Sequence, residues 1–248
     1  MTHHLDPDWI VPDWPAPAHV RALITTRSGG VSTGPYASFN LGDLTEDAHA
    51  AVSENKHRLD ALLPGTPRWL RQVHGDRVVE ADTVGSTVQA DASFTRTPGI
   101  VCAVKIADCM PVLICDRAGE AVAIAHAGWR GLSLGVVENT VRALQIDPTR
   151  LCAYLGPAIG QDAFEVGEDV YQAFCGDDPD ARSAFRPLRP GKWLADLFAL
   201  GRLRLARLGI TAVSGGGLCT VANGARFYSH RRDRITGRMA ALVWMEPR

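Results

Sequence analysis

KIADCMPVLICD, residues 105–116, and AVAIAHAGWRG, residues 121–131, are the two stretches that decide how this chain folds. Both contain short apolar runs bounded by polar or glycine-containing turns, a pattern typical of buried strands. Each also carries a residue that a plain core strand would not select, a thiol at Cys109 and an imidazole at His126. We therefore expect adjacent buried strands that hold two chemically active side chains just before a glycine-rich turn.

The segments around these runs predict several short strands and a few helices. Strands are expected over residues 18–26, 100–106, 111–115 and 121–126, around a turn at His74-Gly75-Asp76 in 68–81, before a turn in 151–160, and after a loop in 227–245. Helices are expected over residues 47–63, 131–146, 165–175 and 193–210. Strands and helices do not alternate cleanly, which favours a mixed α/β (α+β) domain over an open Rossmann sheet.

The composition is that of a globular protein. The chain has 248 residues, of which 46% are hydrophobic and 21% charged. We expect an N-terminal extension over residues 1–17 and one compact catalytic domain over residues 18–248, since neither a repeat nor a linker interrupts the pattern. The formal net charge of -1 gives no electrostatic reason to expect binding to nucleic acid or to an anionic membrane.

The expected location is the cytoplasm. The first residues, MTHHLDPDWIVPDWPAP, contain aspartates and prolines in place of the features of a signal peptide, and no run of 18 apolar residues occurs. The six cysteines include no CxxC pair, so a disulfide framework is not expected.

His74, Cys109 and His126 form a candidate metal site. Each lies at the end of an expected strand or just before a turn. A thiolate and two imidazoles are suitable ligands for Zn²⁺, and three protein ligands leave a fourth coordination position for water or substrate. The long separations along the chain favour a site assembled by the fold over a zinc finger. The alternative is a buried cysteine that acts as a small apolar residue, together with hydrogen-bonded, inert histidines.

Two aspartates accompany these residues. Asp108 precedes Cys109, and Asp91 occurs in QADASFT. Either carboxylate could orient a ligand imidazole or accept a proton during catalysis. The alternative role is capping of a turn or helix.

Other polar residues suggest an anion site. GWRG precedes an expected helix, so Arg130 and the backbone N–H groups of that turn could hold a phosphate. TTRSGGVS places Arg27 and Ser28 in a glycine-rich loop, and Gln72 lies in RQVHGD beside His74. A further loop, SHRRDRITGR, contains residues 230–233 and could equally be a solvated surface turn.

Together, the motifs resemble one known family. They are TTRSGGVS, RQVHGDRV, ADASFT, ADCMPVLICD, AHAGWRG, LGPAIG and FYSHRRDRITGRMAALVW, in this order over residues 21–245. The ordered set resembles the laccase-domain proteins of the YfiH type, also called polyphenol oxidases or peptidoglycan-editing factors. His230 departs from the family pattern, which often has an aromatic residue there.

The resemblance implies a fold, a metal and an activity. It implies mixed sheets flanked by helices, similar to cysteine hydrolases of the deamidating-toxin type. It implies zinc bound by His74, Cys109 and His126, and a purine nucleoside phosphorylase acting on adenosine, inosine, guanosine and methylthioadenosine with phosphate, with added adenosine deaminase activity. In that chemistry Arg27, Ser28 and Arg130 are the candidates for phosphate. A monomer or weak homo-oligomer is expected.

Three alternatives remain open at this stage. The laccase name implies Cu²⁺ and polyphenol oxidation, but the 8 histidines are few for a trinuclear cluster plus a blue-copper site. Cys109 could be a nucleophile with His126 as its base, in a metal-free hydrolase or deamidase acting on peptides or peptidoglycan precursors. Such a dyad would not need His74, whereas a zinc site would. A non-catalytic nucleoside-binding protein is the third alternative.

Overall fold

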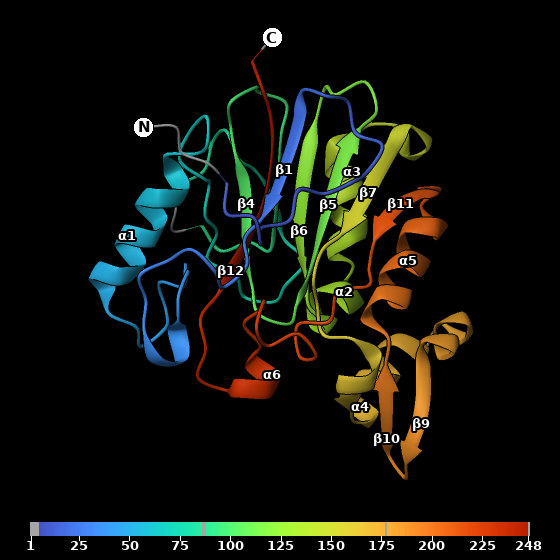
Figure 1. The fold of residues 1–248 in the computed structure, drawn as a ribbon. Coiled ribbons are helices and arrows are strands. Elements are labelled where there is room, and N and C mark those ends of the chain that lie inside the picture. The colour runs from blue at the N-terminus through green and yellow to red at the C-terminus, as the bar shows by residue number, and fades with distance from the viewer. Residues whose placement is uncertain (1–4, 86–87, 177, 248) are drawn as a thin grey trace.

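A six-stranded sheet lies at the centre of the molecule (Figure 1). The computed structural model describes residues 5–85, 88–176 and 178–247. The strands of this sheet, in spatial order, are β11 (Ala212–Gly215), β7 (Leu151–Leu155), β5 (Met110–Asp116), β6 (Val122–Ala127), β3 (Ala92–Thr95) and β2 (Val78–Glu80). Every residue of β5 and β6 is buried. The two quoted stretches are therefore paired central strands, antiparallel to each other.

Two smaller sheets accompany the central one. The first has the order β1 (Val20–Ile24), β12 (Met239–Met245) and β4 (Cys102–Ile106), and all its pairs are antiparallel. Its apolar side chains share one buried cluster with side chains from β5, β6 and β7. The second has the order β8 (Glu165–Val166), β10 (Lys192–Ala195) and β9 (Phe185–Arg189).

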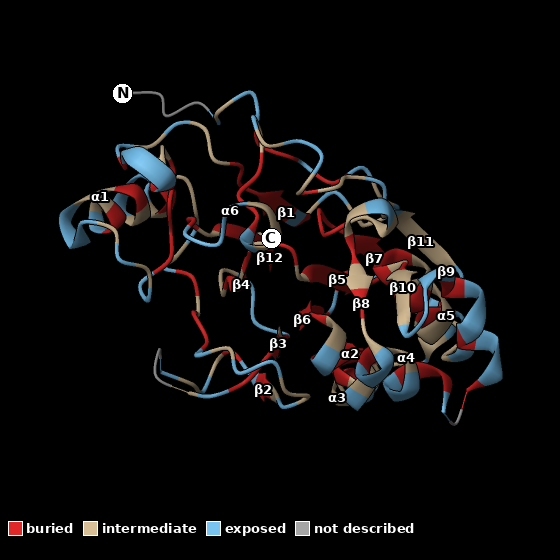
Figure 2. Ribbon diagram, turned by 90° about the horizontal axis from the view of Figure 1, so that it is seen from below, coloured by how far each residue is buried: buried red, intermediate tan, exposed pale blue. Residues whose placement is uncertain are grey.

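Helices flank the sheets, and strands β4, β5, β6, β7 and β12 are largely buried, whereas β9 and β11 are mostly exposed or partly exposed (Figure 2). They are α1 (His49–Asp60), α2 (Trp129–Leu134), α3 (Val136–Leu144), α4 (Glu168–Cys175), α5 (Leu197–Arg207) and α6 (His230–Asp233). Short 3-10 turns occupy Gly34–Tyr36, Pro148–Arg150, Gln161–Ala163 and Pro179–Ala184. In Figure 1, α1 lies on the side of β4 and α5 on the side of β11. The expected mixed α/β arrangement of sheets and flanking helices is confirmed.

Two helices begin later in the sequence than predicted. The helix expected over 193–210 begins at Leu197, because the Asp196 side chain accepts a hydrogen bond from the Ala199 N–H at 2.9 Å and caps it. Residues 193–195 belong to strand β10, in which Trp193 pairs with both β8 and β9. In the segment 165–175, the first two residues form β8, and the helix begins only after Gly167.

Other boundaries also differ. The helix expected over 131–146 begins earlier, at Trp129, and Gly135 divides it into α2 and α3 with a left-handed φ of 96°. In 68–81 only Val78–Glu80 forms a strand within a sheet. The expected loop after residue 227 contains α6, whose first turn is capped by the Ser229 side chain.

The first residues in the described part of the chain contact the domain. Ile10 pairs with Ile24 as an isolated bridge, and Trp9 packs on Phe39 with ring centroids 4.8 Å apart. The division into residues 1–17 and 18–248 stays a prediction. A helix with the length and apolar character needed to cross a membrane does not occur in the described ranges.

Asn55 connects α1 to the glycine-rich loop that follows β1. It is fully buried, and its Nδ2 donates to the Ser32 side chain at 3.0 Å and to the backbone carbonyls of Ser38 and Asn40 at 3.1 and 3.0 Å. Its Oδ1 accepts from the Val31 N–H at 2.9 Å. The side-chain amide of Asn55 therefore forms hydrogen bonds with four polar groups of a loop that has little regular secondary structure.

Replacing Asn55 by alanine is expected to lower the free energy of unfolding by about 2–4 kcal/mol, since buried loop groups would lose their partners. Denaturant unfolding followed by circular dichroism measures this change. Ser53→Ala is the matched control, because Ser53 is exposed on the same helix and should change stability by less than about 0.5 kcal/mol. Equal stability of the two variants would contradict this role for Asn55.

Candidate metal centre and active-site pocket

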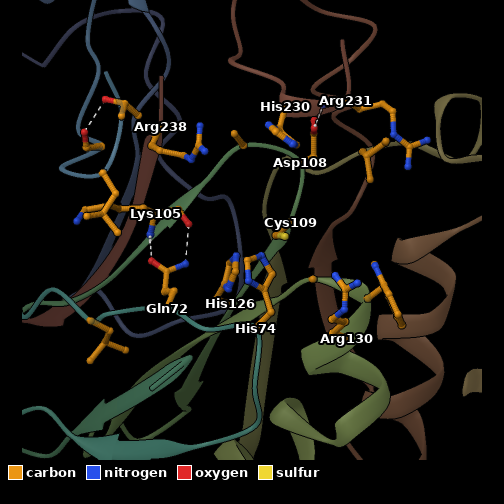
Figure 3. Close-up of a pocket in the computed structure, with 18 of the residues that line it drawn as sticks. Gln72, His74, Lys105, Asp108, Cys109, His126, Arg130, His230, Arg231 and Arg238 are labelled. Atoms are coloured by element: carbon orange, nitrogen blue, oxygen red, sulfur yellow. Dashed lines mark hydrogen bonds between the residues drawn. The ribbon is translucent and has the colours of Figure 1, made fainter. Parts of the chain in front are cut away.

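Three side chains meet at one edge of the central sheet (Figure 3). Cys109 precedes β5, His126 lies in β6, and His74 lies in the turn before β2. One ligand atom from each of the three lies within 4.8 Å of the others. The two imidazole rings meet edge to face, with centroids 5.0 Å apart. The structure therefore brings the three predicted ligands into one cluster.

The carboxylate of Asp91 positions both histidines. It is fully buried, and it accepts hydrogen bonds from the backbone N–H groups of Val73, His74 and Gly75 at 3.1, 2.9 and 2.8 Å. Its Oδ1 also lies 2.9 Å from Nδ1 of His126. The turn carrying His74 is thereby held against β6, and Nε2 of His126 is left to face the cluster. A carboxylate in this position orients a ligand imidazole, as metal sites commonly require.

Sheet pairing and a strained turn place Cys109. Pro111 in β5 lies opposite His126 in β6, and Met110 lies opposite Ala127, the last residue of β6, so Cys109, just before β5, lies beside the end of β6. Asp108 adopts a left-handed φ of 91°, a conformation that costs about 1–3 kcal/mol for a residue with a side chain. Its carboxylate accepts hydrogen bonds from the Thr220 hydroxyl at 2.5 Å and the Arg231 N–H at 2.7 Å, which hold the turn.

The charges of Cys109 and His126 stabilise each other. Burial acts to raise the pKa of the Cys109 thiol, but His126 and His74 outweigh burial and lower this pKa to about 6. Burial acts to lower the pKa of His126, whereas the charge of Cys109 and the hydrogen bond to Asp91 raise it to about 9. Without a metal, Cys109 is therefore a thiolate at neutral pH. A thiolate is the form that binds metal.

The donor set fits a single borderline-soft divalent ion. One sulfur and two imidazole nitrogens are ligands of catalytic zinc sites, and Asp91 supplies the usual outer hydrogen bond. Within residues 5–85, 88–176 and 178–247, no other group of three or more His, Cys, Asp and Glu side chains comes together in this way. A trinuclear copper cluster with a separate blue-copper site needs more ligands than this group offers. His3 and His4 lie outside the described residues.

A pocket of about 560 Å³ opens over the three ligands. One part of its lining is polar and comes from residues 42–45, 71–72, Lys105 and Arg238. Another part is apolar and includes Trp129, Ile159, Phe164 and Leu197. Five arginine or lysine side chains line the pocket against two aspartates, Asp43 and Asp108. A volume of this size accommodates a small organic ligand, and the excess of cations favours an anionic group.

Several predicted site residues line this pocket, namely Gln72, His74, Asp108, Cys109, His126 and Arg130. The Gln72 side chain also makes two hydrogen bonds of 2.8 Å with the backbone of Lys105, which fixes its position. Arg130 is exposed and lies over the Trp129 ring, 4.4 Å from its centroid. Asp91 lies behind the ligands, outside the pocket lining.

Arg27 and Ser28 are not among the residues that line the pocket. Arg27 donates from Nε to the Ala37 carbonyl and from Nη1 to the Gly224 carbonyl, both at 2.8 Å. The Ser28 hydroxyl donates to the carboxylate of Asp8 at 2.8 Å. Both side chains therefore join the glycine-rich loop to neighbouring segments, and the pocket cations come from elsewhere.

Several pocket residues were not predicted from the sequence. Lys105 and Arg238 lie in or beside strands β4 and β12, and Phe164 and Leu197 lie near β8 and α5. The sequence feature that could have identified Lys105 and Arg238 is a charged residue at the end of an apolar strand, as in CAVKI and GRMAALVW. His230 and Arg231 of the SHRRDR loop also line the pocket, which favours a site role over a solvated turn.

The family described as multi-copper polyphenol oxidoreductase laccase matches residues 21–246, and the chain belongs to this family. A Pseudomonas aeruginosa protein named purine nucleoside phosphorylase is 54% identical over 239 residues, or 96% of this chain and 98% of the relative. Purine nucleoside phosphorylase YfiH of Escherichia coli is 50% identical over 95% of this chain and 98% of its own length.

Solved structures have the same fold. The crystal structure of a Neisseria meningitidis protein matches with a TM-score of 0.94 and 51% identity, covering 97% of this chain and all of that one. YlmD from Geobacillus stearothermophilus matches with a TM-score of 0.84 and 30% identity, covering 93% of each chain. The resemblance to YfiH-type proteins and the mixed α/β fold are thus confirmed.

Gly128 has no room for a side chain. A Cβ at this position would lie 2.6 Å from Sγ of Cys109 and 3.5 Å from Cδ2 of His74. Gly128→Ala is therefore expected to weaken metal binding at least about tenfold, because it displaces the Cys109 sulfur. Competition with a chromophoric chelator measures the affinity. Gly217→Ala is the control, since its Cβ would meet no atom within 4 Å, and equal affinities in the two variants would refute the packing argument.

Asp91→Asn is expected to change stability in a pH-dependent way. Burial acts to raise the pKa of Asp91, but hydrogen bonds from His126, Gly75 and Val73 outweigh it and lower this pKa. The lowered pKa adds stability above the unfolded value of about 3.9, and this stability is lost as pH falls further. The metal-free variant should lose at least about 2 kcal/mol at pH 7 and less near pH 3.

Denaturant unfolding of the metal-free proteins across pH 3–7 tests this expectation, because chelation removes any contribution from metal release. The curves of wild type and Asp91→Asn should converge as the pH falls. A constant difference between them would contradict the role of the ionised carboxylate.

Proposed function

We propose that this protein is a zinc-dependent purine nucleoside phosphorylase that cleaves adenosine, inosine, guanosine and methylthioadenosine with phosphate, and that also deaminates adenosine. A cytoplasmic location belongs to the same proposal, since purine nucleosides, phosphate and reduced thiols occur there.

One observation carries the proposal: the His-Cys-His cluster lies in a pocket that has both an apolar and a cationic part. A purine base requires apolar contact, and phosphate requires positive charge. The volume of about 560 Å³ is sufficient for both substrates. Further support comes from the names of relatives that are 54% and 50% identical over nearly the whole chain.

Zinc held by His74, Cys109 and His126 would supply a Lewis acid inside the pocket. The protein residues then perform separate tasks. Asp91 holds His126 in one orientation and fixes the His74 turn through its hydrogen bonds. Asp108 lines the pocket, so we assign it, in preference to the enclosed Asp91, to accept or return a proton.

Arg130 and Gln72 are proposed substrate contacts, because both line the pocket. Arg130 lies near its exposed part, where it can attract an anion. Gln72 is held by the Lys105 backbone, so it presents a fixed surface to the ligand. Arg27 and Ser28 are not included in the proposed phosphate site, because they do not line the pocket.

A second candidate function is favoured by one specific contact. His126 lies between the Cys109 thiol and the Asp91 carboxylate, which is the order of groups in a thiol hydrolase with a Cys-His-Asp arrangement. This candidate is a metal-free hydrolase or deamidase. It leaves His74 without a role in catalysis, whereas the zinc proposal uses all three residues.

Cys109→Ala is expected to abolish zinc binding and to lower phosphorolysis by at least about a thousandfold, because it removes a metal ligand from the reaction centre. Metal content is measured by mass spectrometry. Adenosine or inosine is incubated with phosphate, and the free base, ribose-1-phosphate and inosine are separated by chromatography. Cys175→Ala is the matched control, since Cys175 is buried away from the pocket.

Chelation separates the two candidates. The zinc enzyme should lose activity when the metal is removed and regain it when zinc is restored. Undiminished turnover by metal-free protein would exclude zinc dependence and favour the thiol hydrolase. Phosphorolysis by a metal-free Cys109→Ala protein would refute both assignments.

A further inference from the structure

Arg238 is a half-buried cation of the pocket whose side chain is anchored at only one nitrogen. Nη1 donates to the backbone carbonyls of Thr236 and Gly237, both at 2.9 Å. The Arg238 backbone N–H donates to Oδ1 of Asn40 at 2.8 Å. A Cβ on Gly42 would lie 2.9 Å from Cγ of Arg238, so the glycine makes room for this side chain. The guanidinium is thus held in place by its surroundings.

The remaining nitrogens of Arg238 are available to a ligand. In the described part of the chain, no acceptor is hydrogen-bonded to its Nε or Nη2, and no carboxylate lies within 4.0 Å of it. Burial lowers the pKa of Arg238, with smaller opposing effects from Cys109, Asp108 and Tyr36. A partly desolvated guanidinium that is not directly paired with a carboxylate is stabilised when an anion binds it.

Two other cations of the pocket, Arg71 and Arg130, are exposed to solvent, and the remaining two, Lys105 and Arg231, are engaged by neighbouring groups. Lys105 forms an ion pair with Asp43 and lies over the Trp69 ring, 4.9 Å from its centroid. Arg231 donates from Nη1 to the carbonyls of Ala163 and Glu165 and lies over the Phe164 ring. Lys105 shares the Asp43 carboxylate with Lys56, so its charge is partly compensated, and Arg231 lies beside the apolar part of the pocket.

Arg238 and Arg130 lie on opposite sides of Cys109 (Figure 3). Arg130 is exposed, whereas Arg238 is partly enclosed. The apolar residues Phe164 and Leu197 come from the segments around β8 and α5, away from the sheet that carries Arg238. An apolar ligand and a separate anion can therefore occupy the apolar and the cationic parts of the pocket at the same time.

We propose that the free edge of the Arg238 guanidinium, formed by Nε and Nη2, binds an oxyanion, which in the reaction proposed above is the phosphate co-substrate. Two parallel N–H donors match two oxygens of a phosphate, and a charge-assisted pair of this kind is strong. The nucleoside base then lies against Phe164 and Leu197, on the other side of the metal ligands. The identification of the anion as phosphate rests on the proposed function, whereas the anion site itself does not.

The test compares Arg238→Gln and Arg238→Lys with wild type. Arg238→Gln should raise the KM for phosphate at least about tenfold, because the charged two-point contact is lost. The KM for inosine should stay within about twofold, and the zinc content should not change. Arg238→Lys should fall between the two, since it keeps the charge and loses the paired geometry. Arg186→Gln is the control, because Arg186 is exposed outside the pocket.

Calorimetry with inorganic phosphate makes the outcome independent of turnover. If wild type binds phosphate and Arg238→Gln does not, the anion site is supported even where no phosphorolysis occurs, and only the proposed function fails. Equal phosphate affinity in both proteins, or no binding by wild type, overturns the proposal. An equal rise in the KM of both substrates also overturns it, since Arg238 would then only shape the pocket.

A second titration identifies the source of the phosphate group. Adenosine monophosphate carries the same group on a nucleoside. If the affinity for adenosine monophosphate falls in Arg238→Gln whereas the affinity for inorganic phosphate does not, the site takes a nucleotide, and the co-substrate assignment is wrong. A fall in the affinity for inorganic phosphate in Arg238→Gln supports that assignment.

Discussion

The Asp91 carboxylate is the contact on which the whole site depends. It bonds three successive backbone N–H groups of the turn that carries His74 and, from the same side chain, the imidazole of His126. Two ligands that lie far apart in the sequence are thereby fixed to one buried group. Such a carboxylate is stable in the interior only while all its bonds are made. The precision of the site and the packing of the sheet are therefore linked.

The pocket lies at the junction between two sheets. The polar part comes from the sheet of β1, β12 and β4 and from the loop 42–45, whereas the apolar part comes from segments beyond the edge of the central sheet. Because the two sheets share one buried cluster, their positions relative to each other are fixed by the core. A binding site at such a boundary can be apolar on one side and charged on the other without placing a charge inside the core.

The sequence was most informative where chemistry and strand pattern coincided. Cys109 and His126 are conspicuous because each interrupts an apolar strand, and the structure brings both to His74. Arg27 and Ser28 looked equally suitable for an anion, but a glycine-rich loop does not reveal which way its side chains point. The position of Arg238 in the pocket was not predicted because it depends on Asn40 and Gly42, nearly 200 positions away in the sequence. The start of α5 was not predicted because the sequence alone does not show that the Asp196 side chain caps this helix through a hydrogen bond from the Ala199 N–H.

X-ray absorption spectroscopy at the zinc and copper edges of the protein purified without added metal tests the central claim most directly. We expect about one zinc per chain, with one sulfur and two imidazole groups among its nearest neighbours. Several copper ions per chain, or zinc surrounded only by oxygen and nitrogen, would contradict the assignment of Cys109 and the two histidines as the ligands of a single ion.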